Sequence, residues 1–256
     1  MKPRYRIVFF DADDTLYDFR KCEEMAFLMT LEEQGMACCD EPARIYARYA
    51  EISDRLWKKY QNGEMEKRDV LTNRFHYLFR EFGLICDARA FNESYLLNLG
   101  AQNHLIQNAE RVVRTLSRSC IVSIITNGVA SVHVQRLKNS TIRNFVSHLV
   151  VSSDAEGENH FRKPHPHIFE YTHRLSEASV PKEEILMIGD SLEGDIAGGN
   201  NYGVDTCWLN PGRQDNPTPH IPKYQISNLG SLVSIVYGTA HDDECQERGV
   251  WTTVNV

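Results

Sequence analysis

The chain has 256 residues, of which 42% are hydrophobic and 25% charged, as in an ordinary globular protein of one or two domains. Its formal net charge of −7 argues against nucleic-acid polymers or membrane surfaces as partners. No apolar run approaches the roughly 18 residues of a membrane span, and the seven cysteines, an odd number with no C-x-x-C pair, indicate reduced thiols in a cytoplasmic protein.

The first predicted element is a short strand over residues 7–10, whose unbroken apolar run indicates burial on both faces. Asp11, Asp13 and Asp14 follow it directly. Ligands of open α/β sheets bind beyond the carboxyl ends of the strands, and two carboxylates two residues apart can share Mg²⁺. Asp11 and Asp13 are therefore candidate functional residues, with a solvated acidic turn as the alternative. Asp14 is interpreted as an acid that stabilises the start of the next helix.

Residues 17–100 show helical periodicity instead. Apolar side chains recur at helical spacing in four stretches, which lie around residues 25–29, 45–60, 71–82 and 91–99. Each stretch is followed by a glycine, the residue that most easily adopts the left-handed conformation after a helix, at Gly35, Gly63, Gly83 and Gly100. Four amphipathic helices predict a compact bundle with an aromatic core. Trp57 and Tyr60 are the candidates in this bundle for stacking on a ligand.

From residue 108 onward, helical and strand patterns alternate. Strands are expected at residues 120–125, 145–152, 185–188, 204–209 and 224–226. Helices are expected at residues 109–117, 130–138, 168–176, 196–202 and 229–237. Alternation of this kind predicts a parallel sheet with helices on both faces, which also includes the strand at residues 7–10. The expected fold is α/β: a Rossmann-like core (residues 1–16 and 101–240), an inserted four-helix cap (17–100) and a C-terminal tail (241–256).

Thr126-Asn127-Gly128 follows the second predicted strand, and so falls at the same edge of the sheet as Asp11. A hydroxyl group, together with the backbone N–H groups of a glycine-containing turn at the start of a helix, can bind phosphate. The same three residues also form ordinary turns. Their position beside Asp11 makes them candidate substrate ligands.

A second pair of acids and a lysine occupy the remaining loops at this edge. Asp190 and Asp195 follow the fourth predicted strand. Lys163 lies before the helix expected at residues 168–176, in a segment whose prolines stiffen the backbone that carries the cation. His165 and His167 are interpreted as loop-packing residues. Two acid pairs, a threonine and a lysine at one sheet edge are far more specific than any one of these features.

In this order, the segments resemble the motifs of haloacid-dehalogenase-superfamily phosphatases. Residues 11–15, Asp-Ala-Asp-Asp-Thr, resemble the first motif D-x-D-x-T, and Thr126 resembles the second. Lys163 matches the third motif, and Asp190 with Asp195 matches the fourth. The helical insertion after the first motif is similar to the C1 caps of this superfamily. Several segments, including Lys-Pro-His-Pro-His-Ile-Phe, resemble the pyrimidine 5′-nucleotidase subfamily, although the loop at residues 153–162 is longer than in similar members.

The resemblance implies roles for the acids. Asp11 would be the nucleophile that forms an aspartyl-phosphate, and Asp13 would protonate the leaving oxygen and then deprotonate water. Mg²⁺ would be held by a carboxylate oxygen of Asp11, the backbone carbonyl of Asp13 and a carboxylate oxygen of Asp190. Asp195 would be a supporting residue, which orients Lys163 or a metal-bound water. The substrate phosphate would be bound by Thr126, Asn127, Gly128 and Lys163.

The resemblance thus implies a Mg²⁺-dependent phosphomonoester hydrolase of small phosphorylated metabolites, with pyrimidine nucleoside 5′-monophosphates as the expected substrates. The main alternative is a sugar-phosphate enzyme, either a phosphatase or a mutase similar to β-phosphoglucomutase. A haloacid dehalogenase needs neither Asp13 nor a metal, and a phosphonatase needs a cap lysine placed for a Schiff base, which nothing in the sequence singles out. A non-catalytic binding protein on the same scaffold would be expected to have lost one of the acids.

Overall fold

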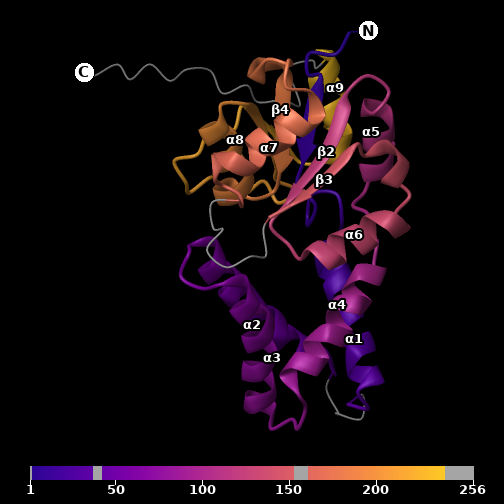
Figure 1. Cartoon of the computed structure of the whole chain (residues 1–256), viewed down its shortest axis with the longest axis vertical. Helices are drawn as coiled ribbons and strands as arrows, with labels where there is room; N and C mark the ends of the chain where they lie inside the picture. Colours follow the sequence, from indigo (N-terminus) through magenta and orange to yellow (C-terminus); the bar gives the residue numbers. More distant parts are fainter. Residues whose placement is uncertain (1, 37–41, 153–160, 240–256) are drawn as a thin grey trace, which may run out of the picture.

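The computed structural model describes residues 2–36, 42–152 and 161–239. An α/β core lies at one end of the molecule and a bundle of four helices at the other (Figure 1). The expected α/β fold with an inserted helical cap is therefore confirmed. Most of the loop at residues 153–162 and the tail at 241–256 lie outside the described residues. Within those residues, no helix is both long enough and apolar enough to cross a membrane.

The core is built on one sheet, in which all neighbouring strands run parallel. Its strands are β1 (Ile7–Phe10), β2 (Ile121–Thr126), β3 (His148–Val151), β4 (Ile185–Gly189), β5 (Asp205–Leu209) and β6 (Tyr224–Ile226). Their order in space is β3-β2-β1-β4-β5-β6. The central position of β1 explains its unbroken apolar run, because none of its four side chains is exposed. The strand predicted at residues 145–152 is shorter than expected, because Arg143–Phe145 forms a 3₁₀ turn before it.

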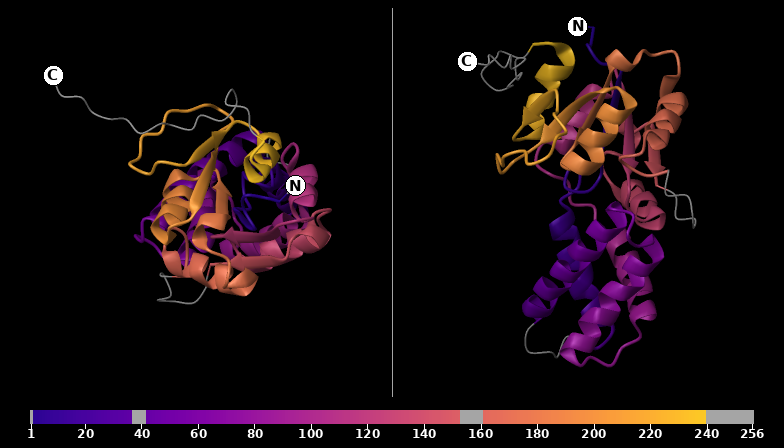
Figure 2. Two further views of the ribbon diagram at one scale, coloured as in Figure 1. Left: turned by 90° about the horizontal axis from the view of Figure 1, so that it is seen from above. Right: turned by 90° about the vertical axis from the view of Figure 1, so that its left-hand side faces the viewer.

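Helices cover both faces of the sheet, as predicted. They are α5 (Ala109–Leu116), α6 (Ala130–Asn139), α7 (Pro166–Glu177), α8 (Ala197–Tyr202) and α9 (Leu232–Tyr237). Val8 and Phe10 of β1 pack in one cluster with α5 and α9, whereas Ile7 and Phe9 pack in another with α7 and α8. Figure 2 shows these layers from two further directions. The helix predicted from residue 196 is preceded by one turn of π-helix at Leu192–Ile196.

The insertion is a bundle of four helices with an aromatic core. Its helices are α1 (Phe19–Glu33), α2 (Pro42–Gln61), α3 (Lys67–Phe82) and α4 (Ala88–Ala101). Phe27, Tyr49, Phe75, Phe91 and Tyr95 are all fully buried at its centre. The rings of Tyr49 and Phe75 stack with their centroids 5.1 Å apart. The aromatic side chains of these stripes therefore form the core of the bundle, as the periodicity predicted.

The predicted helix-ending glycines are correct in three of four cases. The left-handed φ values are +67°, +79° and +63° at Gly35, Gly63 and Gly83. The prediction was wrong for Gly100, because α4 continues through it to Ala101. A Cβ atom at Gly100 would lie 3.3 Å from Cβ of Gln135 and 3.6 Å from Cα of Val132, both on α6. This glycine therefore allows close packing between the bundle and the core.

The chain passes between the core and the bundle twice, and the two passages lie side by side. Tyr17 in the first passage forms a β-bridge with Leu105 in the second. The backbone N–H of Ile106 donates a 2.9 Å hydrogen bond to the carbonyl of Leu16. Tyr17 also forms a bridge with Asp13. The acidic loop after β1 is thereby tied to the point where the bundle joins the core.

Glu23 of α1 is an acid buried inside the bundle, with a contact of 3.3 Å to Nη1 of Arg20. Burial raises its pKa to about 7, from an ordinary value of 4.5. Between these two pH values the unfolded chain releases a proton that the folded chain retains, so the free energy of unfolding falls as the pH rises. We expect Glu23→Gln to remove this decline. The free energy of unfolding of the variant should therefore rise above that of the wild type as the pH goes from 4.5 to 7, by up to roughly 3 kcal/mol. Urea unfolding at several pH values measures it.

A matched control is Glu24→Gln, because Glu24 is the next residue on α1 and is exposed. Its stability should follow the pH dependence of the wild type. If Glu23→Gln also follows the wild-type curve, Glu23 is ionised in the folded protein at neutral pH.

Candidate active site

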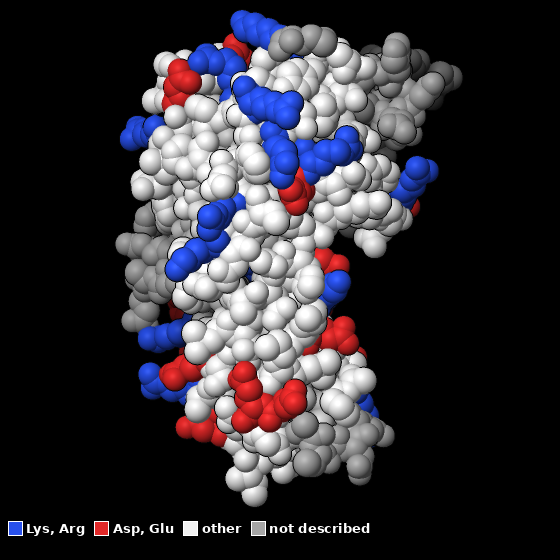
Figure 3. Space-filling model, turned by 90° about the vertical axis from the view of Figure 1, so that its right-hand side faces the viewer, with Lys and Arg blue, Asp and Glu red and all other residues white. Residues whose placement is uncertain are grey.

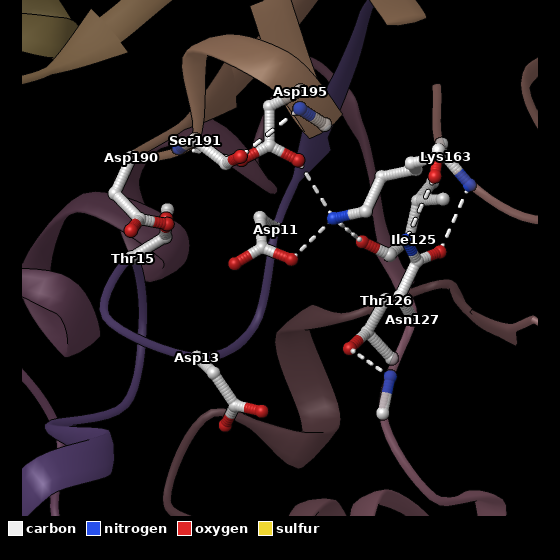
Figure 4. Close-up of polar contacts among 12 residues, drawn as sticks. Asp11, Asp13, Thr15, Ile125, Thr126, Asn127, Lys163, Asp190, Ser191 and Asp195 are labelled. Atoms are coloured by element: carbon white, nitrogen blue, oxygen red, sulfur yellow. Dashed lines mark hydrogen bonds and ion pairs between the residues drawn. The ribbon is translucent and has the colours of Figure 1, made fainter. Parts of the chain in front are cut away.

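The loops at the carboxyl edge of the sheet, which faces the bundle, bring together acids and a lysine that lie far apart in the sequence (Figure 4). Asp11 directly follows β1, and its backbone N–H continues the pairing with β4 through a 2.9 Å hydrogen bond to the carbonyl of Ile188. Thr126 is the last residue of β2, and Asp190 follows β4. Lys163 comes from the segment before α7 and joins the same group of side chains. The parallel sheet therefore places the predicted residues together.

The ammonium group of Lys163 is buried between two carboxylates. Its Nζ donates hydrogen bonds to Oδ1 of Asp11, to Oδ1 of Asp195 at 2.7 Å and to the carbonyl of Ile125 at 2.9 Å. Burial alone would lower the pKa of Lys163, but Asp11 and Asp195 outweigh it and hold this pKa above its usual range. The Asn127 side chain fixes the lysine backbone, with bonds of 2.8 Å to its carbonyl and 2.9 Å from its N–H. Lys163 therefore remains a positioned cation.

Three carboxylates crowd around this one cation. Asp11, Asp190 and Asp195 each offer an oxygen atom within 4.8 Å of the others. Burial and the charges of the two neighbouring acids raise the pKa of Asp11 well above its usual range, and burial with Asp195 raises the pKa of Asp190 to about 7. The buried hydroxyl of Thr15 donates to Asp190 at 3.3 Å. Excess negative charge and oxygen-only ligands fit a hard divalent cation such as Mg²⁺.

The side chain of Asp13 lies apart from this cluster. Its Oδ1 forms an ion pair with Nη1 of Arg136 at 2.5 Å, and its Oδ2 lies 3.4 Å from Nε2 of His133. Although burial raises the pKa of Asp13, these two residues lower it below its usual range. Figure 4 shows the carboxylate pointing away from Asp11 and Asp190. The Asp13 side chain thus faces α6, and only its backbone is left to take the predicted role as a metal ligand.

Neither Arg136 nor His133 was predicted as a site residue. They lie three residues apart in the helix expected at residues 130–138, which begins just after the Thr-Asn-Gly segment. That spacing puts both side chains on one helical face, directly behind a candidate phosphate loop. This is the signal that could have identified them, although basic residues in such a helix usually face solvent.

The Thr126-Asn127-Gly128 turn is folded back on itself. The Gly128 N–H donates to Oγ1 of Thr126 at 3.2 Å, and the same oxygen lies 3.3 Å from Nε2 of His133. Thr126 is buried. The predicted phosphate-binding groups therefore lie at the site, with the Thr126 hydroxyl and the Gly128 N–H bonded to each other.

Two interpretations of neighbouring residues can be compared with their contacts. Asp14 accepts a 3.2 Å hydrogen bond from the N–H of Phe19, the first residue of α1, as expected for an acid at a helix start. Burial raises the pKa of Asp14 to about 6. His165 caps α7, where its ring nitrogen accepts from the N–H of His167 at 3.3 Å. Both contacts are structural.

A cavity of about 240 Å³ lies between this edge of the sheet and the bundle. The bundle side is lined by polar, apolar and aromatic side chains, namely Phe19, Arg20, Asp54, Trp57, Tyr60, Gln61, Arg74, Leu96 and Leu99. On the face drawn in Figure 3, the molecule narrows between the core and the bundle, and Lys and Arg side chains are more frequent on the core than on the bundle. A small molecule that reaches the acids therefore also contacts the cap.

Two basic residues join the tip of the α2–α3 hairpin to the core. Lys67 donates to the carbonyl of Gly128 at 3.0 Å and to the hydroxyl of Ser152 at 2.8 Å. From the core, Arg162 donates to the carbonyl of Tyr60 at 2.7 Å and lies 4.7 Å from the centroid of its ring. The cap is thus bonded directly to the Thr-Asn-Gly turn and to the residue before Lys163.

Comparison with known proteins gives a consistent result. A sequence model of haloacid dehalogenase-like hydrolases matches residues 5–203. The HAD-hydrolase YfnB of Bacillus subtilis is 34% identical over 91% of this chain and 96% of its own length. A crystal structure of YfnB bound to magnesium superposes with a TM-score of 0.82, over 91% of this chain and 99% of that one.

Two further relatives have named activities. The pyrimidine 5′-nucleotidase PynA of Streptococcus pneumoniae is 30% identical, over 90% of this chain and 94% of PynA. The glyceraldehyde 3-phosphate phosphatase of Pyrococcus abyssi is also 30% identical, over 81% of this chain and 82% of the phosphatase. The names of the two relatives describe action on phosphate esters of different kinds, at the same identity to this chain but with greater coverage for PynA.

Proposed function

Because this chain belongs to the haloacid dehalogenase-like hydrolases, we propose that it is a Mg²⁺-dependent phosphomonoesterase of small phosphorylated metabolites. The observation that carries this proposal is the buried Lys163 ammonium, which binds Asp11 and Asp195 beside Asp190. Hydrolysis of a phosphate ester by this mechanism needs a nucleophile, a fixed cation that binds the phosphate oxygens and a site for a second cation. Asp11, Lys163 and the cluster of three carboxylates are the candidates for these roles at one sheet edge.

The proposed reaction has two steps. The Asp11 carboxylate attacks phosphorus and the bond to the leaving oxygen breaks, and Asp13, once turned away from the Arg136 ion pair that keeps it ionised in the orientation shown, gives that oxygen a proton. Asp13 then takes a proton from water, which attacks the aspartyl-phosphate, so that inorganic phosphate leaves and Asp11 is restored. Lys163 and the Thr126-Asn127-Gly128 turn bind the phosphoryl oxygens, where negative charge spreads in the transition state.

Asp11, the backbone carbonyl of Asp13 and Asp190 would hold the cation, which screens the charges of carboxylate and phosphate and orients both. Asp195 would keep Lys163 in place through its 2.7 Å contact. The magnesium in the YfnB structure supports Mg²⁺ as the metal.

The proposed substrates are nucleoside 5′-monophosphates, with pyrimidines preferred. This choice is supported by the similarity to PynA and by Trp57, an aromatic residue of α2 that lines the cavity. Tyr60 is a weaker candidate for stacking on a base, because Arg162 lies over its ring. The second candidate is a sugar phosphate, favoured by the 30% identity to a glyceraldehyde 3-phosphate phosphatase.

Phosphate release from a panel of nucleoside monophosphates and sugar phosphates, with Mg²⁺ and with EDTA, tests the proposal. Preferential turnover of UMP, dUMP or dTMP supports the nucleotidase. Turnover led by sugar phosphates retains the chemistry and changes the substrate. Isomerised sugar phosphate in place of free phosphate would indicate a mutase, and inactivity on the whole panel would favour a binding protein.

A metal-binding prediction has a readout independent of turnover. With EDTA, Asp190→Asn should raise the thermal unfolding temperature, because it removes one of three crowded carboxylates. Mg²⁺ at about 100 times its Kd should stabilise the wild type by about 2.7 kcal/mol, whereas Asp190→Asn should lose most of this response. Differential scanning fluorimetry with and without Mg²⁺ measures both effects, and equal responses of the two proteins would place the metal elsewhere.

A further inference from the structure

Arg136 is fully buried on α6, and its guanidinium contacts three residues from two separate parts of the chain. Nη1 forms the 2.5 Å ion pair with Asp13, and Nε donates a 3.1 Å hydrogen bond to the carbonyl of Gln102. The guanidinium carbon lies 5.2 Å from the centroid of the Tyr17 ring. Burying a charged group is costly unless it is paired and hydrogen-bonded, so these contacts determine where the side chain can lie.

Two of the residues that Arg136 contacts lie in the passages between the core and the bundle. Tyr17 belongs to the first passage, and Gln102 is the residue that ends α4 at the start of the second. Helix α6 also packs closely on α4, at the point where Gly100 leaves room for it. The group that binds Asp13 is therefore held by the same segments that carry the cap.

The second oxygen of Asp13 has its own partner on the same helix. Nε2 of His133 lies 3.4 Å from it, and the ring fits against the Thr-Asn-Gly turn because residue 128 is glycine. A Cβ atom at Gly128 would lie 2.0 Å from that nitrogen. Both oxygens of Asp13 are thus engaged by α6. By contrast, Nη2 of Arg136 has no hydrogen-bond partner among the described residues, which leaves one donor for another orientation of Asp13.

We propose that Arg136 is a positioning residue, which sets the orientation of the Asp13 carboxylate according to the position of the cap. The proposal rests on the phosphatase mechanism above, in which Asp13 must face first the leaving oxygen and then water. In the structure, Asp13 faces α6 instead. Movement of the cap would displace Tyr17 and Gln102 together, and both hold the guanidinium that holds Asp13. His133 supports the same orientation from the other oxygen.

The test compares two esters that differ in their need for a proton. A nucleoside 5′-monophosphate has a poor leaving group that depends on Asp13, whereas 4-nitrophenolate leaves unaided. Arg136→Met should lower kcat/KM, which reports the steps up to loss of the leaving group and excludes the shared hydrolysis of the aspartyl-phosphate, by about 100-fold with the nucleotide and by less than about tenfold with 4-nitrophenyl phosphate. A purely structural role would lower both rates by the same factor. Arg136→Lys, which keeps the charge, should lie between wild type and Arg136→Met.

A double-mutant cycle separates an effect through Asp13 from a general one. Asp13→Asn should reproduce the selective loss on the nucleotide, and adding Arg136→Met should leave the ratio of the two rates unchanged. Lys138→Met, an exposed change on the same helix, is the matched control and should keep the wild-type ratio. If Arg136→Met does not fold, Arg136→Lys is compared in the same cycle.

The outcomes distinguish this inference from the proposed function. Equal losses on both esters, in a wild type that hydrolyses both, would overturn the role of Arg136 alone. A further fall in the ratio when Arg136→Met is added to Asp13→Asn would also overturn it. If the wild type hydrolyses neither ester, the proposed function fails and this inference fails with it.

Discussion

Replacing Asp11 with asparagine is expected to abolish phosphate release while the fold stays intact. The amide has almost the same shape as the carboxylate but is a poor nucleophile, so no aspartyl-phosphate can form, and losses of about four orders of magnitude or more are typical for such a change. Stability should not fall, because the change removes one charge from a crowded cluster and Lys163 keeps its 2.7 Å bond to Asp195. Phosphate release, intact-protein mass after reaction with substrate, and thermal unfolding measure these effects.

Asp215→Asn is the matched control, since Asp215 is an exposed residue of the core. It should release phosphate at the wild-type rate. Substantial turnover by a pure Asp11→Asn preparation would rule out the covalent mechanism through Asp11. A phosphorylated residue other than Asp11 would show that this other residue is the nucleophile.

Lys163→Ala should lower kcat by about two orders of magnitude or more, the scale for the loss of one preorganised electrostatic group. It should also lower the free energy of unfolding by roughly 3–5 kcal/mol, because Asp11 and Asp195 would be left buried without their cation. Mg²⁺ should restore part of the stability but little of the activity. Steady-state kinetics and urea unfolding, each with and without Mg²⁺, separate the two effects.

Lys21→Ala, an exposed change on α1, is the control for removing a lysine and should leave both quantities unchanged. Near-wild-type activity of Lys163→Ala would assign the phosphate contact to a different cation. Lys67 would then be the next candidate, because its Nζ already reaches the carbonyl of Gly128.

The sheet and its acids could be predicted because their signals are local. The apolar run at residues 7–10 is buried whichever strands lie beside it, and parallel strands place Asp11 and Asp190 at one edge without knowledge of any side-chain contact. The bundle was equally accessible, since its stripes repeat at helical spacing. Strands and helices of this kind are determined by patterns among residues that are close together in the sequence.

The features that could not be predicted depend on contacts between distant segments. Arg136 has the same sequence surroundings whether it faces solvent or Asp13, and it is buried by contacts with distant segments, namely α4 and the turn that holds Asp13 and Tyr17. A glycine after an apolar stripe usually marks a helix end, whereas Gly100 lies inside α4 and allows α6 to pack closely against it. The bonds of Lys67 and Arg162 likewise require knowledge of where the cap lies.

Because the two passages between the core and the bundle lie side by side, the helical insertion can be exchanged for a different one without changing the core. Its ends meet at Tyr17 and Leu105, so a bundle of another size or shape can be joined at the same two points while the strand order stays as it is. Arg136 lies at this junction, between Tyr17 and Gln102. A different insertion joined at these two points would therefore change the residues that line the bundle side of the cavity and leave the acids and Lys163 of the core in place, provided that it still contacts Arg136.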